Sequence, residues 1–170
     1  VWQDGLLHGA AGMFPSESVY VFALDPQTGE EVWKTPQDDL PVQGYLLASA
    51  TRLYAPSGRN NPIVLDRGNG KRLRVVEGQG GTYALLTGDQ IVFGPGKTGE
   101  LGLVEHGQPD QLATFAGNHM IVTPRMSYLH SDTEISGLDR TRYLEHSRVK
   151  KSLMLKQREH REAIKKLGPK

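Results

Sequence analysis

The sequence predicts an all-β fold, a partial β-propeller of about four four-stranded antiparallel blades with the last one incomplete, followed by a C-terminal basic α-helix. Acidic residues close four similar β-type segments at intervals near 40 residues, which is the spacing of propeller blades. The 20 glycines and 10 prolines predict many tight turns. Residues 140–167 lack both and are rich in helix formers. Another all-β array or a sandwich with strong turns is the alternative fold.

The repeats are marked by four closing acids, which are 41, 39 and 34 residues apart: Asp25, Asp66, Glu105 and Asp139. We expect equivalent strands of successive blades at Val19–Asp25, Pro62–Asp66 and Glu100–Glu105. Finding all three in a single sheet would contradict the propeller. The first two acids are followed four places later by Gly29 and Gly70, which predicts an Asp-capped hairpin with a left-handed glycine. The third copy has Pro109 at that position, so its turn is expected to differ.

Four short strands joined by tight turns make one blade. In the first unit the expected strands are Leu6–Met13, Val19–Asp25 and Glu30–Thr35, with the innermost strand expected before residue 1. In the second unit they are Tyr45–Ala50, Arg52–Ser57, Pro62–Asp66 and Lys71–Val76. In the third they are Thr82–Thr87, Gln90–Gly94, Glu100–Glu105 and Gln111–Ala116. The fourth has His119–Thr123, Arg125–His130 and Glu134–Leu138, and its outer strand is missing.

Charge divides the chain into an expected propeller part, residues 1–139, and a basic helical part, residues 140–170. The first part holds 9 Lys and Arg against 16 Asp and Glu, a net charge of −7, and the second holds 11 against 3, a net charge of +8. Such asymmetry is typical of two physically different segments. Gly168 and Pro169 then give a clean stop signal for the helix.

One stretch of the first unit, Ala23-Leu24-Asp25-Pro26-Gln27-Thr28-Gly29-Glu30-Glu31-Val32-Trp33, resembles the quinoprotein-type, or PQQ-like, β-propeller repeat A-x-D-x-x-T-G-x-x-x-W. The later copies depart from it, since the tryptophan position holds Arg74, Ala113 and Ser147. The resemblance implies that Trp33 packs between the first two blades, where we expect Leu47 or Leu65 as neighbours. Truncation of Trp33 to Ala would then cost about 3–5 kcal/mol.

The resemblance also bears on function. Propellers of this family usually have more than four blades, so the chain is expected to be an open arc of a larger ring, marginal or sticky on its own. Quinoprotein dehydrogenases hold a quinone and calcium in the funnel of the ring, and many add adjacent cysteines. This chain has no cysteine, and no residue matches a calcium ligand or a catalytic aspartate by motif. We therefore assign no catalytic, cofactor-binding or metal-binding residue and expect no cofactor.

The expected function is a non-catalytic scaffold for protein or ligand interaction. Its partner would be another protein or the remaining blades of its own parent chain, with no specific nucleic acid. One propeller of this family belongs to the outer-membrane protein assembly machinery, which implies a periplasmic or membrane-associated location. No signal peptide is evident, and no stretch approaches the ~18 apolar residues of a membrane-spanning helix. The first alternative to the scaffold function is that the chain is a fragment of a quinone-dependent dehydrogenase.

Other motifs favour ordinary structural roles. Gly94-Pro95-Gly96-Lys97-Thr98-Gly99 fits G-x-G-x-x-G, but a strand follows where a phosphate site needs a helix, so we expect a turn between strands. None of the six histidines has H-E-x-x-H spacing. His119 and His130 could meet across adjacent strands, yet polar strand residues are the default. Ser131 and Asp132 beside His130 do not by themselves give triad geometry.

The basic segment Arg140–Leu167 is predicted to form one helix with a sparse apolar stripe, which Lys156 interrupts. The residues of the stripe are Val149, Leu153, His160, Ile164 and Leu167. We expect this helix to be one arm of a helical hairpin or coiled coil, inserted before the missing strand of the fourth blade. The parent chain would then return after the insertion and supply that strand. The helix should then project from the blades with few contacts and high mobility. A solvated tail is one alternative. A surface for nucleic acid or anionic membranes is the other, since the charge of +8 attracts polyanions.

Overall fold

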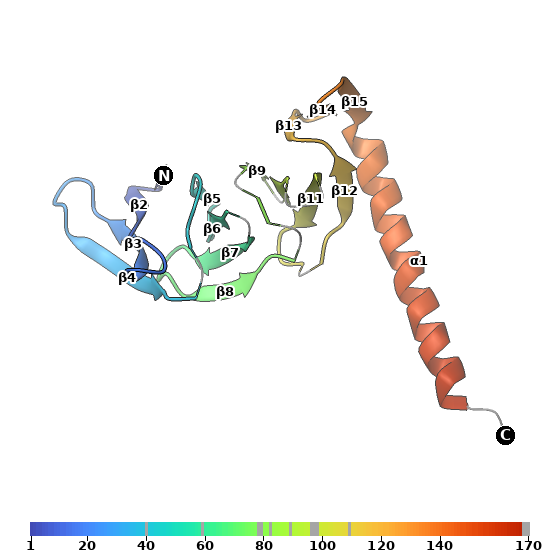
Figure 1. Ribbon diagram of the computed structural model, residues 1–170, viewed down its shortest axis with the longest axis horizontal. Helices are drawn as coiled ribbons and strands as arrows, with labels where there is room; N and C mark the ends of the chain where they lie inside the picture. The colour runs from blue at the N-terminus through green and yellow to red at the C-terminus, as the bar shows by residue number, and fades with distance from the viewer. Residues whose placement is uncertain are drawn as a thin grey trace.

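The computed structural model describes residues 1–170 except residues 40, 59, 78–79, 82, 89, 96–98, 109 and 168–170. Its strands form four successive antiparallel sheets arranged as an open arc, which makes the chain a partial β-propeller (Figure 1). The first sheet contains β1 (Trp2–Gln3), β2 (Leu6–Ala11), β3 (Val19–Leu24) and β4 (Glu31–Gln37). The second contains β5 (Leu47–Ala48), β6 (Arg52–Ser57), β7 (Asn60–Asp66) and β8 (Arg72–Val75).

The third sheet contains β9 (Tyr83–Thr87), β10 (Gln90–Gly94), β11 (Glu100–Glu105) and β12 (Ala113–Ala116). The fourth has three strands among the described residues, β13 (His119–Val122), β14 (Met126–His130) and β15 (Ile135–Asp139), and leads into the helix α1 (Arg140–Leu167). In every sheet the spatial order of the strands follows their order in the sequence, so each sheet is a meander. No helix in the described part of the chain is long and apolar enough to span a membrane.

The predicted equivalence of strands is confirmed. β3, β7 and β11 are each the third strand of a different sheet, and the sheets follow one another in chain order. The missing outer strand is also confirmed, because no described strand pairs with the free edge of β15. The expectation for the innermost strand of the first sheet was wrong. Trp2–Gln3 already pairs with Leu6–Leu7, and this strand is so short that no alternating pattern marks it.

Strand ends differ from the sequence expectation mainly at the inner and outer edges of the sheets. The expected strand Tyr45–Ala50 shortens to the two residues of β5, and Tyr45 is exposed before it. Likewise Gln111–Ala116 shortens to β12. An edge strand pairs with only one neighbouring strand, so the positions of its ends depend on tertiary contacts. These positions cannot be predicted from the β-propensity of the residues alone.

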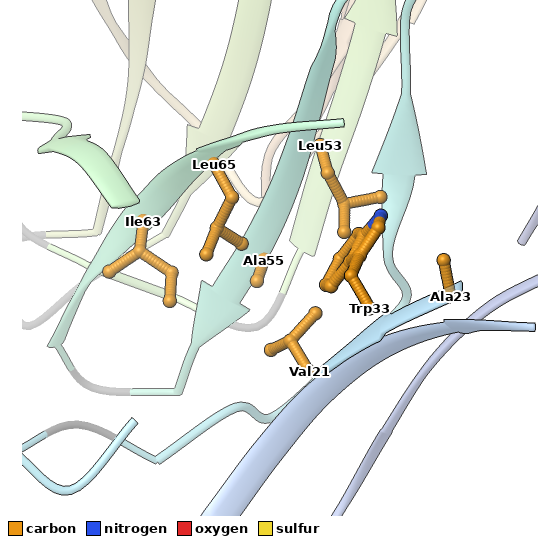
Figure 2. Close-up of a cluster of buried hydrophobic side chains, with 7 residues drawn as sticks. All are labelled: Val21, Ala23, Trp33, Leu53, Ala55, Ile63 and Leu65. Carbon is orange, nitrogen blue, oxygen red and sulfur yellow. The ribbon is translucent and has the colours of Figure 1, made fainter. Parts of the chain in front are cut away.

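The core consists of three apolar layers, each between two successive sheets. The first layer contains residues from the first and second sheets: Val21, Ala23, Trp33, Leu53, Ala55, Ile63 and Leu65 (Figure 2). Trp33 therefore packs between the first two blades, as predicted, and Leu65 belongs to its layer whereas Leu47 packs in the next one. The indole Nε1 donates a hydrogen bond to the carbonyl of Arg67 at 3.0 Å, so the buried ring keeps its polar atom satisfied.

The turns after the first two closing acids have the predicted geometry. Asp25 Oδ1 accepts from the amide of Gln27 at 2.8 Å, and Asp66 Oδ1 accepts from the amide of Gly68 at 2.9 Å. Gly29 and Gly70 have φ of 76° and 71°, the left-handed conformation that glycine adopts most easily. Pro109, where a different turn was expected, lies outside the described residues.

Candidate interaction site

The helix α1 begins on the fourth sheet and extends well past the blades (Figure 1). Asp139 caps it, since Asp139 Oδ1 accepts from the amide of Arg142 at 3.0 Å. The fourth closing acid therefore caps a helix where the first two acids cap hairpin turns. This role was missed in the sequence, although an aspartate directly before a run of helix formers is an N-cap signal.

The first turns of α1 are fixed to the third and fourth sheets. Leu144 is the buried residue of the helix and packs in the third apolar layer. Beside it, the Tyr143 ring meets Phe115 edge to face at 5.2 Å, and its hydroxyl is hydrogen-bonded to Ser127 Oγ at 2.9 Å. Arg140 Nη2 donates to Gln90 Oε1 at 2.7 Å. The expectation of a projecting helix with few contacts thus holds for its C-terminal part and is wrong for its first turns.

Two ion pairs continue the attachment along the third sheet. Arg148 Nη2 lies 2.6 Å from Glu105 Oε1, and Lys151 Nζ lies 3.7 Å from Asp110 Oδ2. Beside these ion pairs, the helix and the edge of the third sheet border an open groove of about 570 Å³. Leu112 and Ala113 line it on the sheet side, and Met154, Leu155 and several basic side chains line it on the helix side. We call this space the helix groove.

The predicted apolar stripe of α1 faces away from the blades. Val149, Leu153, Ile164 and Leu167 are all exposed. Because an α-helix turns by about 100° per residue, the anchoring Leu144 lies on nearly the opposite side from the first three of these residues. We call the set Val149, Leu153, His160, Ile164 and Leu167 the outer stripe. The described helix carries 10 Lys and Arg against 3 Glu, so the outer stripe lies in a strongly basic surface.

Residues considered for catalysis or metal binding do not gather into one site. The run from Gly94 to Gly99 joins β10 to β11, as expected of a turn between strands, although residues 96–98 lie outside the described residues. His119 and His130 do pair across β13 and β14, with ring centroids 6.0 Å apart. Among the described residues no group of three or more His, Asp or Glu side chains could hold a metal ion. Asp132 accepts from Asn118 rather than from a histidine.

Polar groups buried between the sheets join neighbouring blades. The Tyr54 hydroxyl is hydrogen-bonded to His106 Nδ1 at 2.9 Å, and the Tyr83 hydroxyl donates to the carbonyl of Met120. Burial raises the pKa of both tyrosines. Both bonds link one sheet to the next or to its turn, so they stabilise the arc.

Arg67 is a residue that sequence reasoning missed. Its guanidinium donates to the carbonyl of Ala50 at 2.6 Å and to Asp4 Oδ2 at 2.6 Å, and its carbonyl accepts from Trp33. It therefore ties the turn after β7 to the first sheet. Sequence spacing gives no signal for this contact, because its two ends are more than 60 residues apart in the chain.

Solved structures with the same fold include one natural protein and two designed ones. BamB from Moraxella catarrhalis is 16% identical to this chain, with a TM-score of 0.58, and the match covers 74% of this chain and 46% of BamB. The computationally designed protein Ika8 is 15% identical at a TM-score of 0.58, covering 82% of this chain and 44% of Ika8.

The computationally designed protein Ika4 is 14% identical at a TM-score of 0.63, covering 81% of this chain and 87% of Ika4. No protein-family model and no curated protein matches the sequence. The similarities support the propeller fold, and this chain spans about half the length of BamB and of Ika8.

Proposed function

We propose that the chain is a non-catalytic PQQ-like β-propeller repeat scaffold, part of a larger propeller, that binds a protein partner through α1. The observation that carries this proposal is the outer stripe, a row of apolar side chains on a helix that the blades hold by its opposite side. Exposed apolar residues aligned on one helix face are typical of an interface with another helix. The complete A-x-D-x-x-T-G-x-x-x-W match ending at the interblade Trp33 supports the PQQ-like assignment.

Charge defines the partner's chemistry. The described helix has a net charge of +7, with Lys150, Lys156 and Lys165 among its cations. A second basic helix would be repelled, whereas an amphipathic helix with acidic flanks would cover the outer stripe and compensate the charge. Such a pair of helices would form the coiled coil expected from the sequence. The partner helix of α1 would belong to the parent chain or to another protein. The resemblance to the propeller family favours a periplasmic or membrane-associated location.

Binding of a designed peptide tests this role. The probe is a synthetic amphipathic helix of the same length as α1, with leucines on one face and glutamates beside them. Replacing Leu153 by Gln should weaken its binding about tenfold, because an apolar contact worth about 1.4 kcal/mol is lost. Leu155→Gln is the matched control, since Leu155 is also exposed but lies off the outer stripe. Equal effects of the two substitutions would contradict the role of the outer stripe.

The basic surface favours polyanion binding as a second candidate function. It predicts that a double-stranded DNA oligonucleotide binds with an affinity that falls steeply with salt and does not depend on Leu153. Peptide binding that is sensitive to Leu153, together with weak DNA binding at physiological salt, would favour the scaffold. The non-catalytic assignment predicts no reduction of a redox dye when a quinone cofactor and calcium are added to the chain. Turnover in that assay would favour the dehydrogenase alternative.

A further inference from the structure

Two histidines of the fourth sheet face each other across neighbouring strands. His119 in β13 lies directly opposite His130 in β14, and both side chains are exposed. Directly opposite residues of an antiparallel pair project from the same face of the sheet, with their Cβ atoms about 5 Å apart. The two ring centroids are 6.0 Å apart, and the ring planes are tilted by 35°. The two strands therefore present a pair of imidazole rings side by side.

The separation of the rings suits two ligands of one metal ion. An imidazole nitrogen binds Zn²⁺ at about 2.0–2.1 Å, which puts the ion about 3 Å from the ring centroid. In tetrahedral coordination, two such rings have centroids about 5 Å apart. The rings of His119 and His130 need to approach by only about 1 Å to reach this spacing. Rotation of the exposed His130 ring about its χ angles closes such a gap without moving the strands.

The ring of His119 is already held in place by the third sheet. Tyr83 in β9 meets this ring edge to face, with the ring centroids 5.2 Å apart. The Tyr83 hydroxyl donates to the carbonyl of Met120 and accepts from the amide of Met120 at 3.2 Å, which fixes the tyrosine against β13. On the other strand, the carbonyl of His130 accepts from the amide of Asn118 at 2.8 Å. Because these contacts order both strands and one ring, less conformational entropy is lost when an ion binds.

The histidine pair lies at the rim of the inner side of the arc (Figure 1). β9 contacts both β5 and β13, so the first strands of the second, third and fourth sheets lie near one another on that side. Tyr83 and His119 are each the first residue of such a strand. Every contact that positions the pair comes from the third or the fourth sheet. The geometry of the pair therefore does not depend on any further blade of a longer chain.

We propose that His119 and His130 together bind one divalent transition-metal ion of the class of Cu²⁺, Ni²⁺ and Zn²⁺. Neutral imidazole is a preferred ligand of these ions, whereas Ca²⁺ and Mg²⁺ prefer oxygen ligands. Affinity should be highest for Cu²⁺, which binds nitrogen ligands most tightly among these ions. Two protein ligands leave the other coordination positions of the ion open to water. The pair is separate from α1, so this inference stands apart from the proposed function.

Isothermal titration calorimetry of the full chain with Cu²⁺, Zn²⁺ and Ca²⁺ tests this site, and nuclear magnetic resonance with substoichiometric Cu²⁺ locates it. The expected result is saturable binding of Cu²⁺ and Zn²⁺, with line broadening by Cu²⁺ centred on His119 and His130 and no response of these residues to Ca²⁺.

Variants of single histidines show whether the two rings act together. His130→Gln should weaken Cu²⁺ binding at least about tenfold, because the second ligand of a chelate acts at a high effective concentration. His119→Gln should have the same effect. His146→Gln is the matched control and should leave the affinity unchanged, since His146 is also exposed but has no second histidine within one turn of α1.

Three results would overturn the inference. Absence of saturable Cu²⁺ and Zn²⁺ binding would show that the pair is not a metal site. An affinity that is unchanged in both His119→Gln and His130→Gln would place the ion elsewhere in the chain. Equal losses in His130→Gln and His146→Gln would indicate loose binding to any exposed histidine. Circular dichroism of each variant separates a lost ligand from a lost fold.

Discussion

At the scale of single residues, the junction of the first two sheets depends on the fit between Trp33 and Gly70. A Cβ at Gly70 would lie 2.4 Å from the indole ring, which is closer than packed atoms approach. Gly29 occupies the equivalent turn of the first sheet with a similar φ, and a Cβ there would meet nothing within 4 Å. An alanine at Gly29 would therefore test only the energetic cost of the left-handed backbone. An alanine at Gly70 would add the cost of a steric clash with the indole ring.

Replacing each glycine by alanine should give unequal losses of stability. Gly29→Ala should lower the free energy of unfolding by about 1–2 kcal/mol, the cost of a left-handed non-glycine residue. Gly70→Ala should cost about 1–3 kcal/mol more, because the added methyl group displaces Trp33 from the interblade layer. Urea denaturation measures both. Equal losses would mean that the indole does not pack on this turn as described.

His8 makes the same junction sensitive to pH. It is buried beside Trp33, with ring centroids 5.9 Å apart, and neither ring nitrogen has a partner that meets hydrogen-bond geometry. Burial is the main cause that lowers the pKa of His8 below 6.5. The positive charges of Arg67 and the N-terminus act in the same direction, and the backbone of Arg67 and Val1 partly opposes them.

The sign of the pH effect follows from this lowered pKa. Below about pH 6.5 the unfolded chain binds a proton at His8 that the folded chain still excludes, so stability should fall as the pH decreases through that range. His8→Phe should remove this contribution, and the difference in unfolding free energy between pH 7.5 and 5.5 should become smaller. An unchanged slope in His8→Phe would show that burial of His8 does not cause the pH dependence of stability.

At the scale of secondary-structure elements, the start of α1 depends on Asp139. Asp139→Ala should destabilise the first turn by about 1 kcal/mol, the usual cost of losing an N-cap. Asp139→Asn should retain most of the stability, because the amide oxygen can still accept from the amide of Arg142. Hydrogen exchange of the amides in the first turn measures the difference. Identical protection in the two variants would argue against capping.

The elements also show how far the sequence determines this structure. The residue pattern predicts the described extent of α1 correctly, because residues 140–167 lack glycine and proline and are rich in helix formers, although the capping role of Asp139 was missed. It also predicts β10 and β11 to the residue, since Ile91 and Leu103 belong to dense apolar runs. It fails at β1 and β5, whose two-residue strands form only because a longer neighbour offers hydrogen bonds.

The candidate site was less predictable than the fold. The outer stripe follows from helical periodicity at Val149, Leu153 and Ile164, so the sequence reveals it directly. The helix groove does not, because it exists only where Leu112 and Met154 are brought together by the docking of α1. The attachment of Leu144 to the third layer likewise depends on contacts that no spacing rule describes.

At the scale of the whole molecule, the described residues form an ordered row of sheets, and each sheet packs on its neighbours in the row. Contacts of this kind make stability a sum of local sheets and the junctions between them. A sandwich of the same strands would instead bring sheets together that are distant in sequence. The two architectures share their hairpins and differ in the pairs of sheets that meet.

Methyl-to-methyl nuclear Overhauser contacts in the full chain distinguish these architectures most directly. The propeller arc predicts contacts within each layer, such as Val21 with Leu53, Val64 with Ile91, and Leu103 with Met120. It predicts none between buried methyl groups of the first and third layers, such as Val21 and Leu103. Strong contacts between those two layers, with the successive junctions missing, would contradict the propeller arc.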